Sequence, residues 1–299
     1  FSAKEIKHNK KKKTIYYKDA WLKIYDKPIV YFPKFFHPDP TVKRQSGFLM
    51  PSFENSNNIG ASLQVPYYFM LSENKDVTLT PRFYSGKKLL TQSEYREVNA
   101  KSRHDIDFSI LNERSHSSKS HFFSNSTKEL NFENFEVSEI IFQLQQTSDD
   151  TYLKTYKLKS PIIKDTNTLN SSIAINAYRD DLSFSIEMQA YENLSKKQSD
   201  RYEFVYPSYN LNKEFTPNTN LDGNFYFNSS GFIKNYDTNV YEKVVINDFI
   251  FNSNSKFTDK GLKNNYNILL KNINSDSDRS KKYKNKLDNK LATLLEYTS

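Results

Sequence analysis

Apolar and polar residues alternate with a period of two along most of the chain. The apolar series over 182–190 is Leu182, Phe184, Ile186, Met188 and Ala190, and serine, glutamate and glutamine stand between its members. The same alternation occurs over 59–71, 77–84 and 104–110, with thirteen positions in the first of these runs. Successive side chains of a β-strand point to opposite faces, so the pattern predicts an all-β chain with one apolar and one polar face.

Clusters of turn-forming residues separate these runs, at 72–75, 85–88, 149–150 and 179–181. They divide the chain after Ser46 into about a dozen predicted strands, many of about ten residues. Ordinary strands have about 5–6 residues. A tilted strand needs about 9–11 residues to cross a bilayer. The length of the runs therefore favours membrane-spanning strands.

One segment near the C-terminus has helical spacing instead. Leu287, Leu291, Leu294 and Leu295 are spaced for one face of a helix over 284–296. A polar stretch precedes it. The sequence therefore predicts a long loop near 272–286 and a helix at its end.

The first 45 residues have a different character. Lys10 to Lys13 form a lysine run that is interpreted as a solvated turn, and two strand-like segments follow, over 14–25 and 28–36. A proline-dense link at 37–40 comes next. The sequence therefore predicts a first domain over 1–45 and a second over 46–299.

Composition narrows the function classes. The 299 residues include no cysteine, which excludes disulfides and thiolate metal sites within the chain, and six scattered glycines form no phosphate-binding loop. Aromatic residues reach 15%, too many for a disordered chain. The net charge of +8 fits nucleic acid, anionic lipid or solubility alone. Outside Lys10–Lys13 the basic residues are interleaved with acids, so no nucleic-acid partner is expected.

The sequence offers no clear arrangement of catalytic or metal-binding residues. His116 and His121 are interpreted as surface-loop residues, because no third metal ligand accompanies them. The acidic pairs at 149–150 and 180–181 are interpreted as turns. The chain is therefore predicted to be no enzyme and to need no cofactor.

Two prolines interrupt strand-like runs. Pro51 and Pro66 each lie within such a run, where proline cannot donate to the hydrogen-bond ladder. They mark either bulges in ordinary strands or a deliberately weakened line in the sheet.

Four segments carry a family resemblance. Residues 16–33 resemble the end of the periplasmic domain of the LPS-assembly (LptD) family, and 43–51 resemble that family's entry into its barrel. Residues 65–68 and 76–82 are similar to its second and third barrel strands. The match is specific over about 16–84 and rests on strand rhythm beyond that.

The resemblance implies an architecture and an activity. Residues 1–45 would be the C-terminal part of a periplasmic β-jelly-roll. Residues 46–299 would be the first part of an antiparallel transmembrane β-barrel of about 26 strands. Such a protein transports lipopolysaccharide into the outer leaflet of the outer membrane of a Gram-negative bacterium, through a lateral gate at the barrel seam. The implied partners are lipopolysaccharide, the plug lipoprotein LptE, the periplasmic bridge protein LptA and the barrel-assembly machinery.

The resemblance also carries over particular residues. Pro51 and Pro66 match the strand prolines beside the lateral gate. The junction between jelly-roll and barrel is matched by His37, Pro38, Asp39, Pro40, Lys43, Arg44, Ser46 and Gly47. Arg82 is interpreted as a phosphate contact on the lumen side, because its fork suits phosphate, with an interior ion pair as the alternative.

Two alternatives remain open from the residues alone. One is another outer-membrane β-barrel, a porin or a barrel enzyme. The other is a soluble β-sandwich or solenoid that binds glycans or a protein, whose apolar faces would pack together. The chain begins at Phe1 without a leader, so an internal fragment is expected. Members of the LptD family often carry disulfides, and the absence of cysteine here leaves two alternatives: the cysteines lie outside the fragment, or this member does without them. Such a fragment is predicted not to close a barrel.

Overall fold

The computed structural model describes residues 2–24, 26–42, 44–113, 117–197, 200–216 and 222–298. They form strands β1 to β20 and one short helix, α1 (Tyr152–Thr155), which confirms the all-β prediction. The chain folds as two compact units. The first comprises residues 1–97 and 110–118, and the second 98–109 and 119–299.

A three-stranded antiparallel sheet opens the first unit. Its strands are β1 (Ser2–Asn9), β2 (Thr14–Ile24) and β3 (Lys27–Pro38), in the order β1-β2-β3. The lysine run forms the β1–β2 turn, as predicted. Paired aromatic rings stabilise the β2–β3 pairing, with Trp21 and Tyr31 centroids 4.9 Å apart. Among the described residues, no strand of this sheet is hydrogen-bonded to β4, which begins at Gly47.

Short strand pieces follow in the same unit. They are β4 (Gly47–Phe48), β5 (Ser52–Ser56), β6 (Gly60–Gln64) and β7 (Tyr67–Ser72), before β8 (Lys75–Tyr84) and β9 (Leu89–Val98). The run over 59–71 is thus two strands, not one. The alternation of apolar and polar residues continues from 59 to 71, but Pro66 interrupts the backbone hydrogen bonding at the position between β6 and β7. These breaks also make the strands more numerous than the sequence predicts.

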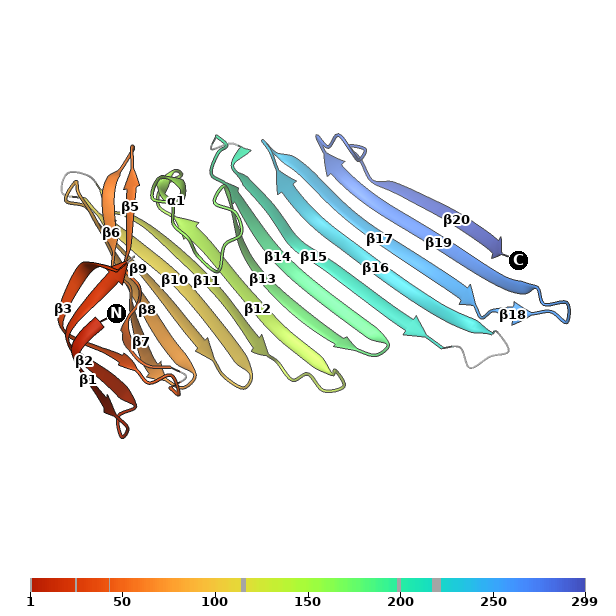
Figure 1. The fold of residues 1–299 in the computed structure, drawn as a ribbon. Helices are drawn as coiled ribbons and strands as arrows, with labels where there is room; N and C mark the ends of the chain where they lie inside the picture. Colours follow the sequence, from red (N-terminus) through yellow and green to blue (C-terminus); the bar gives the residue numbers. More distant parts are fainter. Residues whose placement is uncertain are drawn as a thin grey trace. The chain divides into compact units, whose positions relative to one another are not determined.

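Longer strands build the sheet of the second unit (Figure 1). β10 (Ser102–Asn112) lies at the division between the units, and α1 lies between β12 and β13. The others are β11 (Lys119–Glu129), β12 (Val137–Thr147), β13 (Thr168–Arg179), β14 (Leu182–Asn193), β15 (Tyr202–Phe215), β16 (Gly223–Tyr236), β17 (Val240–Ser253), β18 (Lys256–Phe257), β19 (Lys263–Asp278) and β20 (Asp288–Thr298). From β11 to β20 each main strand pairs antiparallel with the next, β17 pairing directly with β19.

The C-terminal helix predicted over 284–296 is wrong. β20 is a strand, paired with β19 from Ser275↔Asp288 to Asn265↔Thr298. The four leucines have helical spacing, but pairing with a neighbouring strand satisfies the backbone of the segment and overrides that local pattern. The predicted loop is likewise shorter than 272–286. β19 continues to Asp278, so the connection is 279–287.

The large antiparallel sheet is not closed. Among the described registers β20 pairs with β19, and nearly all of its residues are exposed. Figure 1 shows β20 at the margin beyond β19. This open edge agrees with the prediction of an incomplete barrel. In the described part of the chain, no helix has the length and apolar character to cross a membrane.

Candidate functional site

The first candidate site is a line of interrupted hydrogen bonding through β4 to β8. Only Gly47↔Tyr68 and Phe48↔Tyr67 pair between β4 and β7, and pairing resumes at Ser52↔Gln64 between β5 and β6. Between these two pairs the chain advances four residues from Phe48 to Ser52, but only three from Gln64 to Tyr67 on the opposite strand. The first strand therefore carries one extra residue over 49–51, a β-bulge that ends at Pro51.

Pro66 interrupts the next strand in a different way. The register with β8 continues across it, from Gln64↔Arg82 to Tyr67↔Leu79. The Leu49 N–H donates to the Pro66 carbonyl at 2.9 Å. Hydrogen-bonded residues of an antiparallel pair normally exchange two bonds. Pro66 has no N–H, so the reciprocal bond to Leu49 is missing.

A third proline repeats this arrangement on β8. The Val65 N–H donates to the Pro81 carbonyl at 3.1 Å, and Pro81 cannot return the bond. The pairs Leu49/Pro66 and Val65/Pro81 therefore form a proline line, in which neighbouring strands share one bond instead of two. Sequence reasoning placed Pro81 in an ordinary strand. The fifteen-residue spacing of the three prolines was the signal that it missed.

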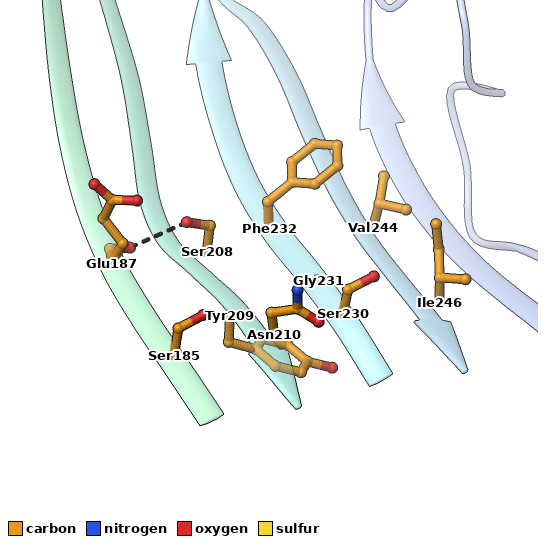
Figure 2. Close-up of a pocket in the computed structure, with 10 residues that line it drawn as sticks. All are labelled: Ser185, Glu187, Ser208, Tyr209, Asn210, Ser230, Gly231, Phe232, Val244 and Ile246. Carbon is orange, nitrogen blue, oxygen red and sulfur yellow. Dashed lines mark hydrogen bonds between the residues drawn. The ribbon is translucent and has the colours of Figure 1, made fainter. Parts of the chain in front are cut away.

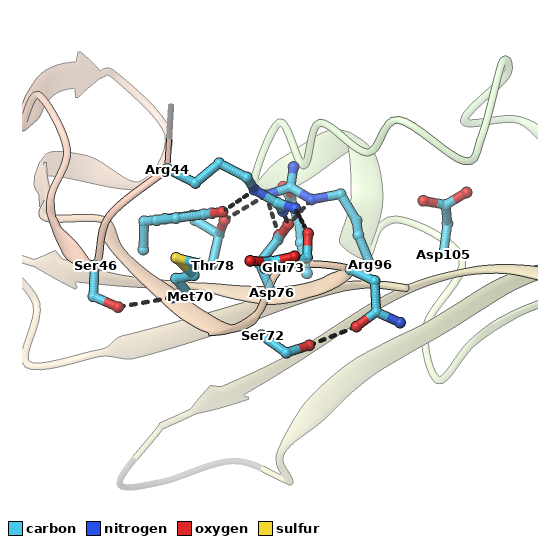
Figure 3. Close-up of polar contacts among 12 residues, drawn as sticks. Arg44, Ser46, Met70, Ser72, Glu73, Asp76, Thr78, Arg96 and Asp105 are labelled. Carbon is cyan, nitrogen blue, oxygen red and sulfur yellow. Dashed lines mark hydrogen bonds and ion pairs between the residues drawn. The ribbon is translucent and has the colours of Figure 1, made fainter. Parts of the chain in front are cut away.

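Arg44 clamps the strands beside this line (Figure 3). Its guanidinium donates to the Tyr68 hydroxyl at 2.9 Å and to the Glu73 carbonyl at 2.8 Å, and it forms an ion pair with Asp76. Arg96 holds the other oxygen of the Asp76 carboxylate, with Nε to Oδ1 at 2.7 Å. Asp76 is 3% exposed. The buried carboxylate of Asp76 on β8 thus links Arg44 to Arg96 on β9, and the Tyr68 hydroxyl links Arg44 to β7.

The other predicted junction residues have separate contacts. Ser46 Oγ accepts from the Met70 N–H at 2.8 Å, and Gly47 begins β4. His37 Nε2 lies 2.8 Å from the Tyr17 hydroxyl, within the first sheet. Asp39 accepts from the Thr41 N–H at 2.8 Å and pairs with His8.

Pro38 ends β3, Pro40 is an exposed turn residue, and Lys43 lies outside the described residues. The structure thus brings Arg44 and Ser46 to the barrel strands, whereas His37 and Asp39 contact the first sheet. The residues predicted for the junction thus form two groups with separate contacts, and their role as a junction stays a prediction.

The predicted phosphate contact, Arg82, lies on β8 and is 8% exposed. Its Nη1 lies 3.4 Å from the Tyr84 hydroxyl. Both side chains are buried. Phosphate contact by Arg82 stays a prediction, and so does the alternative of an interior ion pair.

The sheet of the second unit separates an apolar face from a polar face. Ile173, Ile175 and Ala177 pair with Met188, Ile186 and Phe184, and the intervening pairs are Ala174↔Glu187 and Asn176↔Ser185. Side chains of the apolar face stay exposed, including Phe108, Phe122, Phe142, Ile173, Met188, Phe249, Ile268 and Leu270. An exposed apolar band of this extent marks contact with a membrane or a protein.

The polar face contains a hollow of about 260 Å³ (Figure 2). Ser185, Glu187, Asn210 and Ser230 contribute polar groups, and Phe232, Val244 and Ile246 contribute apolar ones. Tyr209 and Gly231 complete the lining, together with Ser208, whose hydroxyl donates to the Glu187 carbonyl. The hollow offers hydrogen bonds beside a small apolar surface.

A buried hydrogen-bond chain was missed at the sequence level. Ser109 Oγ lies 2.6 Å from His121 Nδ1 and 2.8 Å from the Tyr152 hydroxyl, and His121 Nε2 lies 3.3 Å from Asp107 Oδ1. These side chains are at most 1% exposed, so the prediction of a surface His121 is wrong. His116 lies outside the described residues. Tyr152 covers the serine, so this chain anchors α1 and gives a substrate no access.

Charged contacts join the connections at the α1 end of the sheet. Lys119 pairs with Asp149 at 2.9 Å, and Arg201 contacts Asp150 and Glu192, each at 2.6 Å. The hydrogen bonds that Arg201 donates to the carboxylates of Asp150 and Glu192 raise the pKa of Arg201. Burial alone would raise the pKa of Asp149. The hydrogen bonds from Lys119 and Thr151 together outweigh this effect, so the pKa of Asp149 lies below its usual value. Among the described residues no cluster of metal-ligating side chains occurs.

Comparison with known proteins gives one consistent result. No family model matches the chain. An LPS-assembly protein LptD of Pseudomonas entomophila is 27% identical over 244 residues, 79% of this chain and 24% of the relative. A Pseudomonas putida LptD is 25% identical over 238 residues, 77% of the chain. Another Pseudomonas putida LptD is 39% identical over 93 residues, 31% of the chain.

These matches and the fold agree. The chain spans about a quarter of the length of the curated relatives that it matches most extensively. Its strands, its open antiparallel sheet and its apolar band are those of part of a β-barrel. The chain is therefore similar to LPS-assembly proteins LptD over a part of their length.

Proposed function

We propose that this chain belongs to an outer-membrane β-barrel that transports lipopolysaccharide to the outer leaflet, without catalysis. The exposed apolar band on strands of 10 to 16 residues carries the proposal. In water such a surface would associate or aggregate. In contact with lipid tails the same apolar surface is stable. The opposite polar face would line a hydrated lumen for the sugar and phosphate groups of the lipid. A soluble β-sandwich would instead pack its apolar faces together.

The connections of the second unit support an orientation. The longest connection, the twenty residues over 148–167, lies at the same end of the strands as the one over 279–287. The opposite end has the two-residue turn Asp180–Asp181 and the nine residues over 254–262, which include β18. Outer-membrane barrels have short periplasmic turns and longer external loops. The α1 end then faces outward. Residues 1–45 would lie in the periplasm, as part of the jelly-roll.

The proline line would serve as the lateral gate. Each of the pairs Leu49/Pro66 and Val65/Pro81 has one backbone bond where two are usual. A missing bond removes about 0.5–1.5 kcal/mol of stabilisation. The first strands can therefore bend away from the barrel wall at lower cost than strands with a continuous ladder. Arg44 would keep the base of this hairpin fixed while its far end moves.

The partners in this proposal follow from the relatives' assembly role. Lipopolysaccharide is the cargo. A periplasmic bridge protein of the LptA kind would deliver it, a plug lipoprotein of the LptE kind would occupy the lumen, and the barrel-assembly machinery would insert the barrel. The membrane is the outer membrane of a Gram-negative bacterium.

An engineered disulfide tests the gate in the full-length protein. Phe48 and Tyr67 are directly paired, with ring centroids 4.8 Å apart, so Phe48→Cys/Tyr67→Cys can form a cross-strand bond beside the break. We expect oxidation to stop the arrival of lipopolysaccharide at the cell surface and a reductant to restore it. The matched control is Asn176→Cys/Ser185→Cys, a paired position in the continuous β13–β14 ladder. Full delivery by both oxidised variants would contradict the gate. A depleted strain that still delivers lipopolysaccharide without the protein would contradict the function itself.

A further inference from the structure

The β19–β20 connection is the most basic exposed segment of the second unit. Residues 279–290 contain Arg279, Lys281, Lys282, Lys284, Lys286 and Lys290, against the single acid Asp288. Including Asp276 and Asp278 on β19, the net charge over 276–290 is +3. All six basic residues are exposed. Sequence reasoning divided this segment between a loop and a helix and assigned it no role.

The connection is ordered by its own hydrogen bonds. Ser280 Oγ donates to Glu242 Oε1 on β17 at 2.6 Å, and accepts from the backbone N–H groups of Lys282 and Tyr283 at 3.0 and 3.1 Å. Ser277 Oγ donates to the Lys284 carbonyl at 2.8 Å. The basic side chains are therefore presented from a fixed backbone, which lowers the entropy cost of binding.

Several of these cations have no carboxylate to neutralise them. Lys284 Nζ lies 3.0 Å from Asp288 Oδ1, and Lys290 shares that carboxylate at 3.7 Å. In the described part of the chain, Lys281, Lys282 and Lys286 form no ion pair with a carboxylate, and Lys282 Nζ lies 5.2 Å from the Tyr283 ring centroid. Unpaired ammonium groups on an ordered loop suit phosphate, which they contact as point charges.

We propose that this loop binds the phosphate groups of the lipopolysaccharide layer at the outer surface, around the barrel. The choice of this source rests on the proposed function, because the α1 end of the sheet would face that layer. Glu242 holds the loop through Ser280, and Lys281, Lys282 and Lys286 contact the phosphates. The loop thereby concentrates phosphorylated lipid at the barrel rim.

The test measures binding by the full-length protein in detergent. The variant Lys281→Gln/Lys282→Gln/Lys286→Gln is compared with Lys10→Gln/Lys11→Gln/Lys12→Gln, which removes the same charge from the exposed β1–β2 turn. The probes are bisphosphorylated lipid A, lipid A without phosphates, and phosphatidylglycerol. Each basic residue near an anionic lipid surface contributes about 1 kcal/mol, so we expect the loop variant to bind bisphosphorylated lipid A at least about tenfold more weakly. The control should change less than about twofold, because its lysines lie in a solvated turn.

The outcomes separate the loop from other sources of binding. An equal loss in both variants would show a general charge effect and overturn the proposal, as would unchanged binding by the loop variant. Equal binding of dephosphorylated lipid A by the wild-type protein would also overturn it. Preferred binding of phosphatidylglycerol would reassign the ligand to phospholipid and reject the lipopolysaccharide layer.

A second variant, Ser280→Ala, tests whether order matters without changing charge. It removes the anchor to Glu242, and we expect an intermediate loss of lipid A binding. Delivery of lipopolysaccharide by these variants is measured in parallel. If wild-type protein binds lipid A through the loop but delivers none, the proposed function fails while the loop site stands.

Discussion

The strands β4 to β8 and the strands β13 to β17 share the same alternation of apolar and polar residues, but they are held together differently. β13 and β14 pair through every residue from Thr168↔Asn193 to Arg179↔Leu182. β4 and β7 pair at two positions only, and prolines leave the neighbouring backbone pairs with single bonds. The regular region relies on its ladder, whereas the interrupted region relies on side chains around Asp76.

This difference teaches that alternation fixes which face a residue occupies but not how firmly its strand is attached. In the interrupted region, Arg44 and Arg96 form ion pairs with the two oxygens of the Asp76 carboxylate, and these contacts help to hold the strand register. In the regular region only bulges near Gln189 and Tyr206 disturb a register that is otherwise set by backbone bonds. Local weakness can therefore coexist with a defined geometry.

The largest expected effect comes from removing the carboxylate that holds the interrupted region. Asp76→Ala leaves Arg44 and Arg96 without their shared acceptor. We expect a loss of about 3 kcal/mol in the free energy of unfolding, the lower end for breaking a buried ion pair, because both arginines are partly exposed. Urea unfolding of the full-length protein in detergent, followed by circular dichroism, measures it. Asp105→Ala is the control, because Arg103, its partner, is 65% exposed and the pair contributes at most about 0.5 kcal/mol. Equal losses would break the comparison.

The next prediction concerns close packing in the regular region. A Cβ at Gly231 would lie 2.6 Å from Tyr209 Cε1 and 2.9 Å from the Val244 carbonyl oxygen, which is backbone and cannot move freely. We expect Gly231→Ala to cost about 1–3 kcal/mol of stability. At Gly86 the nearest atom would be 3.9 Å away, so Gly86→Ala should be close to neutral. The same unfolding assay compares the two, and a neutral Gly231→Ala would show that the ladder there is looser than its register indicates.

Restoring a donor to the proline line should have a smaller effect of opposite sign. Pro66→Ala supplies the N–H that the Leu49 carbonyl lacks, and we expect a gain of about 0.5–1.5 kcal/mol. Amide exchange at Leu49 should slow, and delivery of lipopolysaccharide should fall if the line is the gate. Pro33→Ala, on the edge strand β3, is the control. Faster exchange at Leu49 in Pro66→Ala would contradict the assignment.

The smallest prediction is a pH effect at the junction. Hydrogen bonds from the backbone and side chain of Thr41 lower the pKa of Asp39, with a further contribution from His8. A lowered folded-state pKa stabilises the protein above the unfolded value of about 3.9, and this stabilisation is lost as pH falls through the folded value. Asp39→Asn should therefore remove part of the acid sensitivity below about pH 4. An unchanged acid unfolding midpoint would place that sensitivity elsewhere.

Much of the fold could be predicted from the chain alone. Alternation over 182–190 identified β14 and its apolar face, because a period of two has one geometric meaning in a strand. Turn residues at 179–181 marked the β13–β14 turn, because Asp favours such turns. Pro51 and Pro66 stood out in the sequence, since proline cannot donate to a hydrogen-bond ladder. The resemblance over 16–84 added the family that the comparisons support.

Other features required the tertiary structure, because they depend on which strands become neighbours. The leucines over 287–295 have helical spacing, and only pairing with β19 makes the segment a strand. The serine-rich stretch around His121 predicted an exposed side chain. His121 is buried because Tyr152, 31 residues later in the chain, packs near it and shares the Ser109 hydroxyl. The missing backbone bond at Pro81 became visible only from the structure, which places Val65 opposite it. The sequence by itself determined the faces of this sheet, since side-chain direction is local. The tertiary structure decided its backbone bonds and the contacts of Arg44 and Arg96 with Asp76, since each joins residues that the chain keeps apart.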